Sequence, residues 1–298
     1  MSSKKSKKKE KKQLHGRERL IQQKINVILS NKLIIVGIIL TLFMVIIAVF
    51  APLIATHDPL ATEPIDRLSP PSRDYLMGTD SAGRDVFSRV VYGTRLSMMI
   101  AAGVVFFTTI GGMIVGLIAG YYEKIDPIIM RFMDGMMSFP SLLLAIAVMT
   151  LFDPSPVNVV IALSIVYTPR TARIVRGDVL KLKNQDFVEA ARSLGGSDFR
   201  IIVKHILPNT LSSVIVQETF LLAMVFLAEA SLSFIGAGTP PPAPSWGNVL
   251  SEGRNFMYQA PWLTMFPGLF IIMAVMGINL LGDGLRDVLD PRMKSDVN

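Results

Sequence analysis

The chain has 298 residues, of which 51% are hydrophobic and 18% are charged, and it contains no cysteine. A soluble domain carries about a quarter charged residues, so this composition argues against a disordered chain and against a disulfide-stapled secreted domain. The net charge of +7 is uneven, because residues 1–32 hold 11 Lys and Arg against 2 Glu and the remainder holds 19 against 21. A slightly acidic, very apolar body argues against nucleic acid as a partner.

The first predicted element is a membrane helix over residues 33–55, which carry no charge. A spanning helix needs about 20 apolar residues, whereas the apolar core of a secretory signal has roughly 7 to 15. This run of 23 residues follows a basic segment, so we expect a retained helix behind a cytoplasmic tail, 1–32. We expect this tail to extend into solvent or to rest on anionic membrane lipid.

The segment 56–95 is rich in Pro, Asp and Ser and is expected to form an extracytoplasmic loop. A core domain over 96–282 is expected to hold five further membrane helices. These cover residues 96–120, 135–152, 156–167, 210–237 and 261–282. The helix that begins at residue 156 reaches membrane length only if it continues past Pro169.

The distribution of basic residues predicts the topology. Six helices place both termini on one side of the membrane, and basic residues concentrate on the cytoplasmic side. With the N-terminus in the cytoplasm, the inner segments hold 24 Lys and Arg and the outer segments hold 6. The expected fold class is therefore an all-α integral membrane protein with six transmembrane helices and both termini cytoplasmic, ending in a cytoplasmic tail, 283–298.

The familiar signatures of catalysis and cofactor binding are absent from the sequence. It has no GxxxxGK[ST] phosphate loop, no GxSxG and no HExxH. The three histidines lie in the tail, the outer loop and an inner loop, and without cysteine they form no plausible zinc cluster. We expect no catalytic residue, no metal site and no cofactor bound by this chain.

The longest inner polar segment, 181–208, reads KLKNQDFVEAARSLGGSDFRIIVKHILP. It predicts two short helices divided at Gly195, with Asp186 as the N-cap of the first and Glu189 completing a capping box. Ala190 and Ala191 are small, so a partner could approach the backbone closely. Packing of the helix pair against the membrane bundle, with Glu189 only a cap, explains the pattern equally well.

The second of these helices is expected to bury one apolar stripe. Its members follow the spacing i, i+3, i+4, i+7 and are Phe199, Ile202, Val203 and Ile206.

The segment 181–208 resembles the EAA loop of ABC importer permeases. The pattern of that loop is EAA, three residues, Gly, nine residues, Ile, one residue, Leu-Pro. The matching residues here are Glu189, Ala190, Ala191, Gly195, Leu207 and Pro208. His205 stands where the general pattern has Ile, and HILPN resembles the peptide-permease branch.

Three further segments extend the resemblance to the dipeptide, oligopeptide and nickel permeases. They are MGTDSAGRDVFSRVVYGTRLS at 77–97, ASLSFIGAGTPPPAPSWG at 230–247 and GDGLRDVLDPR at 282–292. The short loop after the first helix is similar to that of the C-type subunit in this branch.

The resemblance implies an ABC importer permease fold in a prokaryotic cell membrane, with the EAA loop as a coupling helix on an ATPase. The implied partners are a second homologous permease subunit, two cytoplasmic ATPase subunits that hold ATP and Mg, and an extracytoplasmic substrate-binding protein. The chain itself would be no enzyme. Its implied function is one half of a peptide translocation path with alternating access, and nickel or another small solute is an alternative cargo.

Two carboxylates fall inside the fifth predicted span. Glu218 and Glu229 lie 11 residues apart and therefore on one helix face. They could line the translocation path and attract a cationic group such as a peptide amino terminus. The favoured alternative is that a neighbouring helix holds each of them, because one shared face also suits a fixed helix contact.

Two other classes of function remain open from the residues alone. A secondary transporter driven by an ion gradient would be expected to show internal repeats or ionisable relays, and no clear repeat is present. A structural or sensor subunit that transports nothing is the third class. Gly112, Gly116 and Gly120 form a small-xxx-small series, which predicts a closely packed helix face rather than a site.

Overall fold

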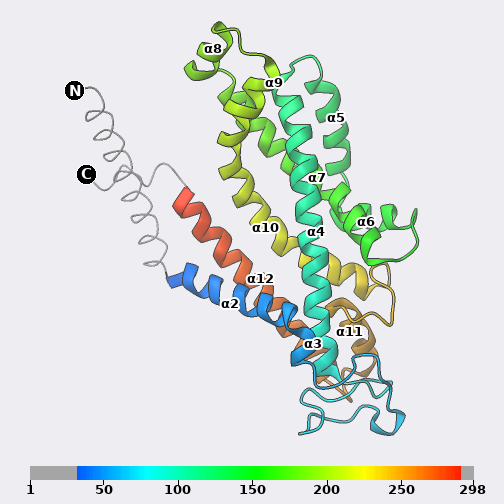
Figure 1. Ribbon diagram of the computed structural model, residues 1–298. Helices are drawn as coiled ribbons and strands as arrows, with labels where there is room; N and C mark the ends of the chain where they lie inside the picture. Colours follow the sequence, from blue (N-terminus) through cyan, green and yellow to red (C-terminus); the bar gives the residue numbers. More distant parts are fainter. Residues whose placement is uncertain (1–31, 290–298) are drawn as a thin grey trace, which may run out of the picture.

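The computed structural model describes residues 32–289, in which the regular elements are helices (Figure 1). The predicted tail over 1–32, apart from Lys32, and the end of the predicted tail 283–298 lie outside this range. The long helices are α2 (Lys32–Val49), α4 (Val86–Tyr121), α7 (Pro156–Leu182), α10 (Leu207–Phe234) and α12 (Trp262–Leu289). The shorter ones are α3 (Ala51–Ile54), η1 (Pro64–Asp66), α5 (Asp126–Met137), α6 (Ser141–Met149), α8 (Asp186–Ser193), α9 (Asp198–Ile201), η2 (Ile202–Ile206), α11 (Trp246–Gly253) and η3 (Arg254–Phe256).

Four stretches of the described chain are long and apolar enough to cross a membrane. They are α2, α4, the stretch Asp198–Phe234 that ends with α10, and α12 up to Val288. The pair α5 and α6 gives a fifth crossing if the two are counted together. The prediction of an all-α membrane protein is confirmed at this level.

The prediction of one continuous helix over 135–152 is wrong. The chain there forms the end of α5 and all of α6, which bend by 93° at a break between them. Pro140 lies in this break. Its nitrogen has no hydrogen to donate, and its ring disfavours helical backbone at the preceding Phe139, so the helix stops and restarts in a new direction.

Two helices are longer than their apolar runs. α7 continues through the buried Pro169 to Leu182, as its predicted continuation required. α4 begins at Val86 because the Asp85 side chain caps it, accepting a hydrogen bond from the backbone N–H of Ser88 at 2.9 Å. The first ten residues of α4 therefore belong to the segment 56–95, which was expected to be a loop.

Helix α4 packs most closely on α7. A Cβ added to Gly112, Gly116 or Gly120 would lie 2.5 to 2.6 Å from atoms of α7, so only glycine permits this approach. The small-xxx-small prediction is confirmed. Helices α2 and α12 pack side by side and diverge from the upright helices toward one side of the molecule (Figure 1).

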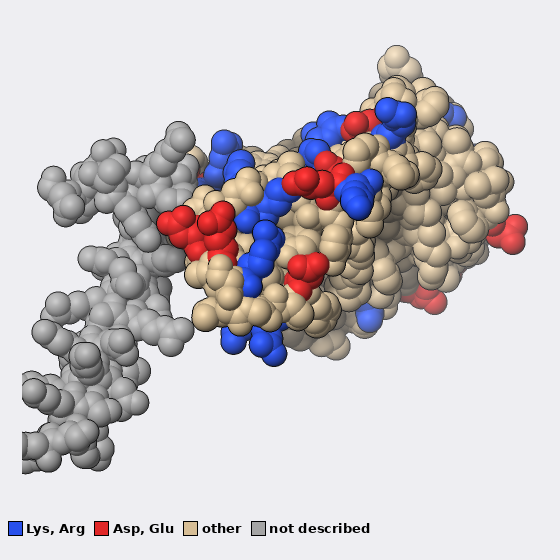
Figure 2. Space-filling view, turned by 90° about the horizontal axis from the view of Figure 1, so that it is seen from above, with Lys and Arg blue, Asp and Glu red and all other residues tan. Residues whose placement is uncertain are grey.

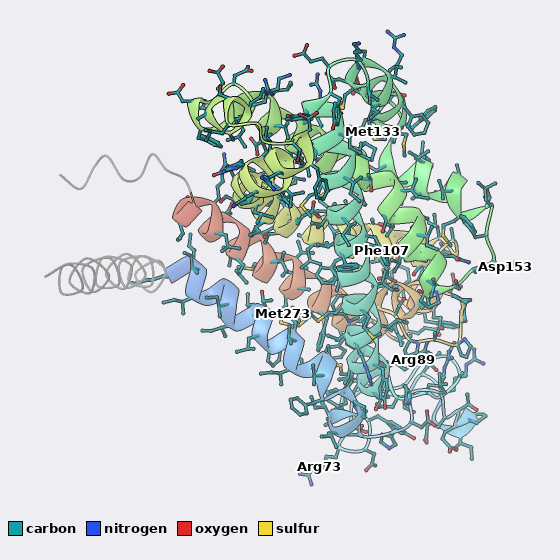
Figure 3. All side chains as sticks on the ribbon, turned by 45° about the horizontal axis from the view of Figure 1, so that its top comes forward. Arg73, Arg89, Phe107, Met133, Asp153 and Met273 are labelled. Carbon is teal, nitrogen blue, oxygen red and sulfur yellow. The ribbon has the colours of Figure 1, made fainter. Side chains whose placement is uncertain are left out.

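The molecule has two distinct ends (Figure 1). The loop end is formed by residues 181–208, and the far end is formed by residues 56–85 together with α11. Arg89 lies toward the far end and Met133 toward the loop end (Figure 3). A main hydrophobic core fills the bundle, and a second small core lies at the loop end.

Candidate functional site

Helix α8 ends in a two-bond C-terminal cap at the two glycines. The N–H of Gly196 donates to the carbonyl of Ala191, and the N–H of Gly195 donates to the carbonyl of Arg192, both at 3.0 Å. This pattern needs a left-handed residue at the first glycine, and Gly195 has φ of +78°. The predicted division of the loop at Gly195 is therefore confirmed.

The predicted capping box at the start of α8 is wrong. Gln185 occupies the N-cap position and Asp186 is the first helical residue, and no side chain caps the helix. Glu189 and Asp186 instead stand in the first turn, where negative charge favours the helix dipole. Glu189 is consequently not needed as a cap, and its side chain forms no hydrogen bond or ion pair with another described residue; its backbone N–H donates to the carbonyl of Gln185 at 3.2 Å.

The loop is fixed to the bundle by the small core at the loop end. Val188 of α8, Ile201 of α9 and Ile206 of η2 are fully buried. They pack with Val175 and Val179 of α7 and with Val214 of α10. Because both short helices contribute to this core, the loop is held in one position on the bundle.

The apolar stripe predicted for the second helix is wrong, because Phe199 and Val203 are exposed and Ile201 is buried in their place. Residues 202–206 form a π-helix, closed by the N–H of Leu207 donating to the carbonyl of Ile202. Hydrogen bonds over five residues bring Ile201 and Ile206 onto one face. Pro208 explains the wider turn, since its ring would clash with the carbonyl of the fourth preceding residue in a regular helix.

The outward side of the loop presents apolar side chains together with small and charged residues. We call this surface the loop face. Its apolar members are Phe187, Leu194, Phe199 and Val203, of which Leu194 is 89% exposed and Phe199 is 77% exposed. Glu189, Ala190 and Gly195 are exposed beside them, and Ala191 is half-buried. Exposed apolar side chains gathered at one place mark an interaction surface.

Charged groups surround the loop face. Seen onto this end, Lys and Arg side chains are interspersed with Asp and Glu (Figure 2). The Tyr121 hydroxyl donates to Asp198 at 2.7 Å, which ties α4 to α9. A hydrogen bond with Tyr121 also raises the pKa of the exposed Arg192 above its ordinary value. Leu207 and Pro208 lie where α10 begins, half-buried and exposed respectively.

Neighbouring helices hold both carboxylates of α10. Thr171 of α7 donates to Glu218 at 2.6 Å, and Glu218 is 6% exposed. Ser97 of α4 donates to the fully buried Glu229 at 3.0 Å, and Ser233 donates to its other oxygen at 2.9 Å. These contacts favour the fixed helix contact over a role in a translocation path, which stays a prediction.

Residues 112–295 match the family described as the binding-protein-dependent transport system inner membrane component. This chain belongs to that family. Residues 20–71 also match the N-terminal transmembrane domain of oligopeptide transport permease C. The permease is therefore a multi-pass membrane protein of the ABC importer type, a family whose members work with separate ATPases and binding proteins.

Relatives of the permease align over most of their length. It is 47% identical over 261 residues to a putative peptide transport system permease protein of Brucella abortus, covering 88% of each chain. It is 46% identical over 267 residues to the dipeptide transport system permease protein DppC of Alkalihalophilus pseudofirmus, covering 89% of this chain and 88% of the relative. The oligopeptide permease OppC of Bacillus subtilis is 39% identical, over 89% and 87%.

The fold has a solved counterpart in an inward-facing structure of the MetNI methionine ABC transporter. The two superpose with a TM-score of 0.57 at 19% identity, over 68% of this chain and 97% of the other. This likeness confirms the permease fold.

A network of buried charges at the far end of the permease was missed by the sequence reading. Arg89 of α4, whose side chain is 1% exposed, pairs with Asp80 and, at 2.9 Å, with Glu252 of α11. Arg84 pairs with the same two acids at 2.7 and 2.8 Å. The network joins two segments of the far end that are far apart in sequence. Its signal in the sequence was the cluster of charges within the segment 77–97.

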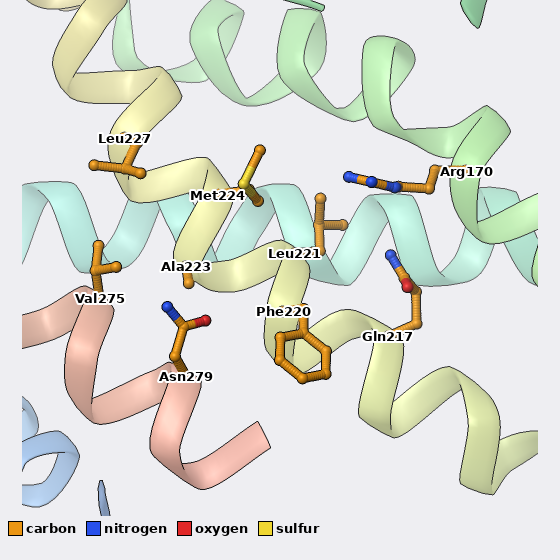
Figure 4. A pocket seen from close by; sticks show the side chains of 9 residues that line it. All are labelled: Arg170, Gln217, Phe220, Leu221, Ala223, Met224, Leu227, Val275 and Asn279. Carbon is orange, nitrogen blue, oxygen red and sulfur yellow. The ribbon is translucent and has the colours of Figure 1, made fainter. Parts of the chain in front are cut away.

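A pocket between α7, α10 and α12 was also missed (Figure 4). Its volume is about 340 Å³. The lining residues are Arg170, Gln217, Phe220, Leu221, Ala223, Met224, Leu227, Val275 and Asn279. Glu218 and Glu229 are not among them. The pocket is formed by three helices that are distant in sequence, so no local sequence pattern predicts it.

Proposed function

We propose that the permease is one of the two transmembrane subunits of an ATP-driven, binding-protein-dependent importer of peptides. The names of its relatives support peptides as the cargo, since they are described as peptide, dipeptide and oligopeptide permeases. In this proposal the chain forms half of the translocation path together with a second homologous permease.

The observation that carries the proposal is the loop face. Its apolar side chains are exposed, although the loop beneath them is anchored in a buried core. An anchored element with an exposed apolar surface is suited to receive a partner and to pass displacement to the helices that hold it. We propose that one of the two cytoplasmic ATPases, which hold ATP and Mg, docks here. Glu189, Ala190, Ala191 and Gly195 would lie at the contact, and Leu207 and Pro208 at its junction with α10.

The proposed topology has six crossings and both termini in the cytoplasm. It counts α7, whose 27 residues are long enough to span, and the bent pair α5 and α6 as one crossing each. The loop end then faces the cytoplasm, in agreement with its excess of basic residues. The far end faces outward, where the extracytoplasmic binding protein would deliver its peptide.

Glu189→Lys tests this coupling. Because the Glu189 side chain is exposed and has no hydrogen bond or ion pair within the described chain, its replacement is expected to leave the fold intact. Reversing a charge at a docked interface is expected to lower ATP-dependent peptide uptake about tenfold or more. The measurement is uptake into liposomes, with co-purification of the ATPase subunits as the second readout.

Glu63→Lys is the matched control, because Glu63 is an exposed glutamate at the far end. It should leave ATPase co-purification unchanged. The coupling proposal fails if Glu189→Lys, alone or combined with Gly195→Ala, retains both the ATPases and wild-type uptake.

A further inference from the structure

The pocket between α7, α10 and α12 is mostly apolar, with two polar side chains together at one end and a third on another wall. Arg170 reaches from α7 toward α10, and Gln217 projects from α10 on the same side (Figure 4). Asn279 adds a third polar side chain from α12. The lining contains no Asp or Glu. A ligand in this pocket therefore meets one positive charge and two amides.

Arg170 differs from the other basic residues that follow it on α7. Arg173 pairs with Asp134, and Arg176 pairs with Asp126 through two hydrogen bonds of 2.5 Å. Arg170 forms no ion pair with any residue between 32 and 289. It is exposed into the pocket, although its neighbours Pro169 and Thr171 are buried. An arginine kept unpaired within a crossing helix is costly and marks a functional position.

The chemistry of the pocket suits the carboxyl end of a short peptide. A guanidinium presents parallel N–H groups that bind a carboxylate through two hydrogen bonds. The amides of Gln217 and Asn279 can both donate to and accept from peptide bonds, independently of the peptide's sequence. Met224 provides an adaptable apolar wall for differing side chains. The volume of about 340 Å³ lies within the range of small-ligand pockets.

The amino end of a peptide has no counterpart in this pocket. The carboxylate of Glu218, which follows Gln217 in the sequence, accepts a hydrogen bond from Thr171 of α7 and is buried. Charge complementarity therefore favours the carboxylate over the ammonium group as the ligand.

We propose that Arg170 and Gln217 bind the C-terminal carboxylate of the peptide as it passes the pocket that α7, α10 and α12 line. The proposal rests on the proposed function in peptide import and assigns a specificity-determining contact within it.

The test uses the complete transporter in liposomes, with the binding protein preloaded with trialanine or with trialanine amide. Arg170→Gln is expected to lower the uptake of trialanine about tenfold, the effect of losing one charge-assisted hydrogen-bonded pair. Uptake of the amide and ATP hydrolysis stimulated by loaded binding protein should remain near wild type. Arg170→Lys, which keeps the charge without the two-pronged geometry, should fall in between.

Arg73→Gln serves as the matched control, since Arg73 is exposed at the far end, remote from the pocket (Figure 3). If the binding protein does not bind trialanine amide, the test uses trialanine alone. The readout is then the number of trialanine molecules taken up per ATP hydrolysed, which should fall about tenfold in Arg170→Gln.

Three results would overturn the proposal. Unchanged uptake of trialanine in Arg170→Gln shows that the peptide does not use the pocket. Equal losses for both peptides, or loss of the second permease subunit on purification, assign Arg170 to assembly instead. Absence of ATP-dependent trialanine uptake by wild type overturns the proposed peptide function itself, which distinguishes that failure from failure of the subsite.

Discussion

Gly116→Ala is expected to destabilise the permease by forcing α4 away from α7. A Cβ at this position would lie 2.6 Å from the carbonyl oxygen of Ala172 and 2.6 Å from the Cβ of Val175. Ordinary contacts of a Cβ begin at 3.4 Å. The two helices must therefore separate by about 0.8 Å, since a backbone carbonyl cannot rotate out of the way as a side chain can.

The size of the effect follows from two opposing contributions. Overpacking of a close contact costs about 1–3 kcal/mol, and separation of α4 from α7 also loosens the neighbouring glycine contacts. The gain in helix propensity from glycine to alanine is about 1 kcal/mol. Their difference is about 0–2 kcal/mol, and the loosened neighbouring glycine contacts place the expected net loss toward the upper end of that range. At roughly 2–4 °C per kcal/mol, the midpoint of thermal unfolding falls by several degrees.

The assay is the fraction of purified permease that remains monodisperse in detergent after heating. Gly135→Ala is the control, because a Cβ there meets nothing within 4 Å and the backbone is helical. The control should be neutral or slightly stabilising. If Gly116→Ala is as heat-resistant as Gly135→Ala, the close approach of α4 and α7 is not as described and the reasoning is refuted.

Two further predictions concern buried charges. Arg89→Gln leaves the buried Asp80 with Arg84 as its remaining partner, and is expected to lower the free energy of unfolding by about 3–5 kcal/mol. The same heating assay measures this loss, and an unaltered midpoint would show that the network contributes no stability. The double substitution Glu218→Gln and Glu229→Gln keeps oxygens that accept from Thr171 and Ser97, so uptake should stay within about threefold of wild type. A loss beyond tenfold, or an altered substrate preference, would return these residues to the translocation path.

Features set by local spacing could be predicted from the sequence. The left-handed turn at Gly195 follows from a helix-like run ended by two glycines, and the closely packed face of α4 follows from glycine at every fourth position. Both depend on backbone geometry within a few residues. The identity of α7 as the helix on that face comes from the structure. The family resemblance likewise rests on spacing within short segments, and the comparisons confirm it.

Features set by a single proline or by distant partners could not be predicted in the same way. Pro140 breaks an apolar run that composition alone describes as one span, and Pro208 widens the preceding turn so that burial moves from Phe199 to Ile201. The pairing of Arg89 with Glu252 depends on tertiary contacts across 163 residues. A periodicity of 3.6 residues carries no information about either kind of event.

The two ends of the permease are joined by one continuous helix. α4 is anchored at the far end by the ion pairs of Arg89 and reaches the loop end, where the Tyr121 hydroxyl binds Asp198 beside α8. Its 36 residues span about 54 Å.

Helix α7 packs against α4 through the glycine contacts, contains Arg170 and ends where the loop begins. A displacement of the loop face by a docked ATPase is therefore expected to move α4 and α7 as a pair, because sliding one past the other would place larger side chains of α4 where only glycine fits against α7. This arrangement connects the site of proposed ATPase docking to the pocket without requiring any change inside the helices themselves.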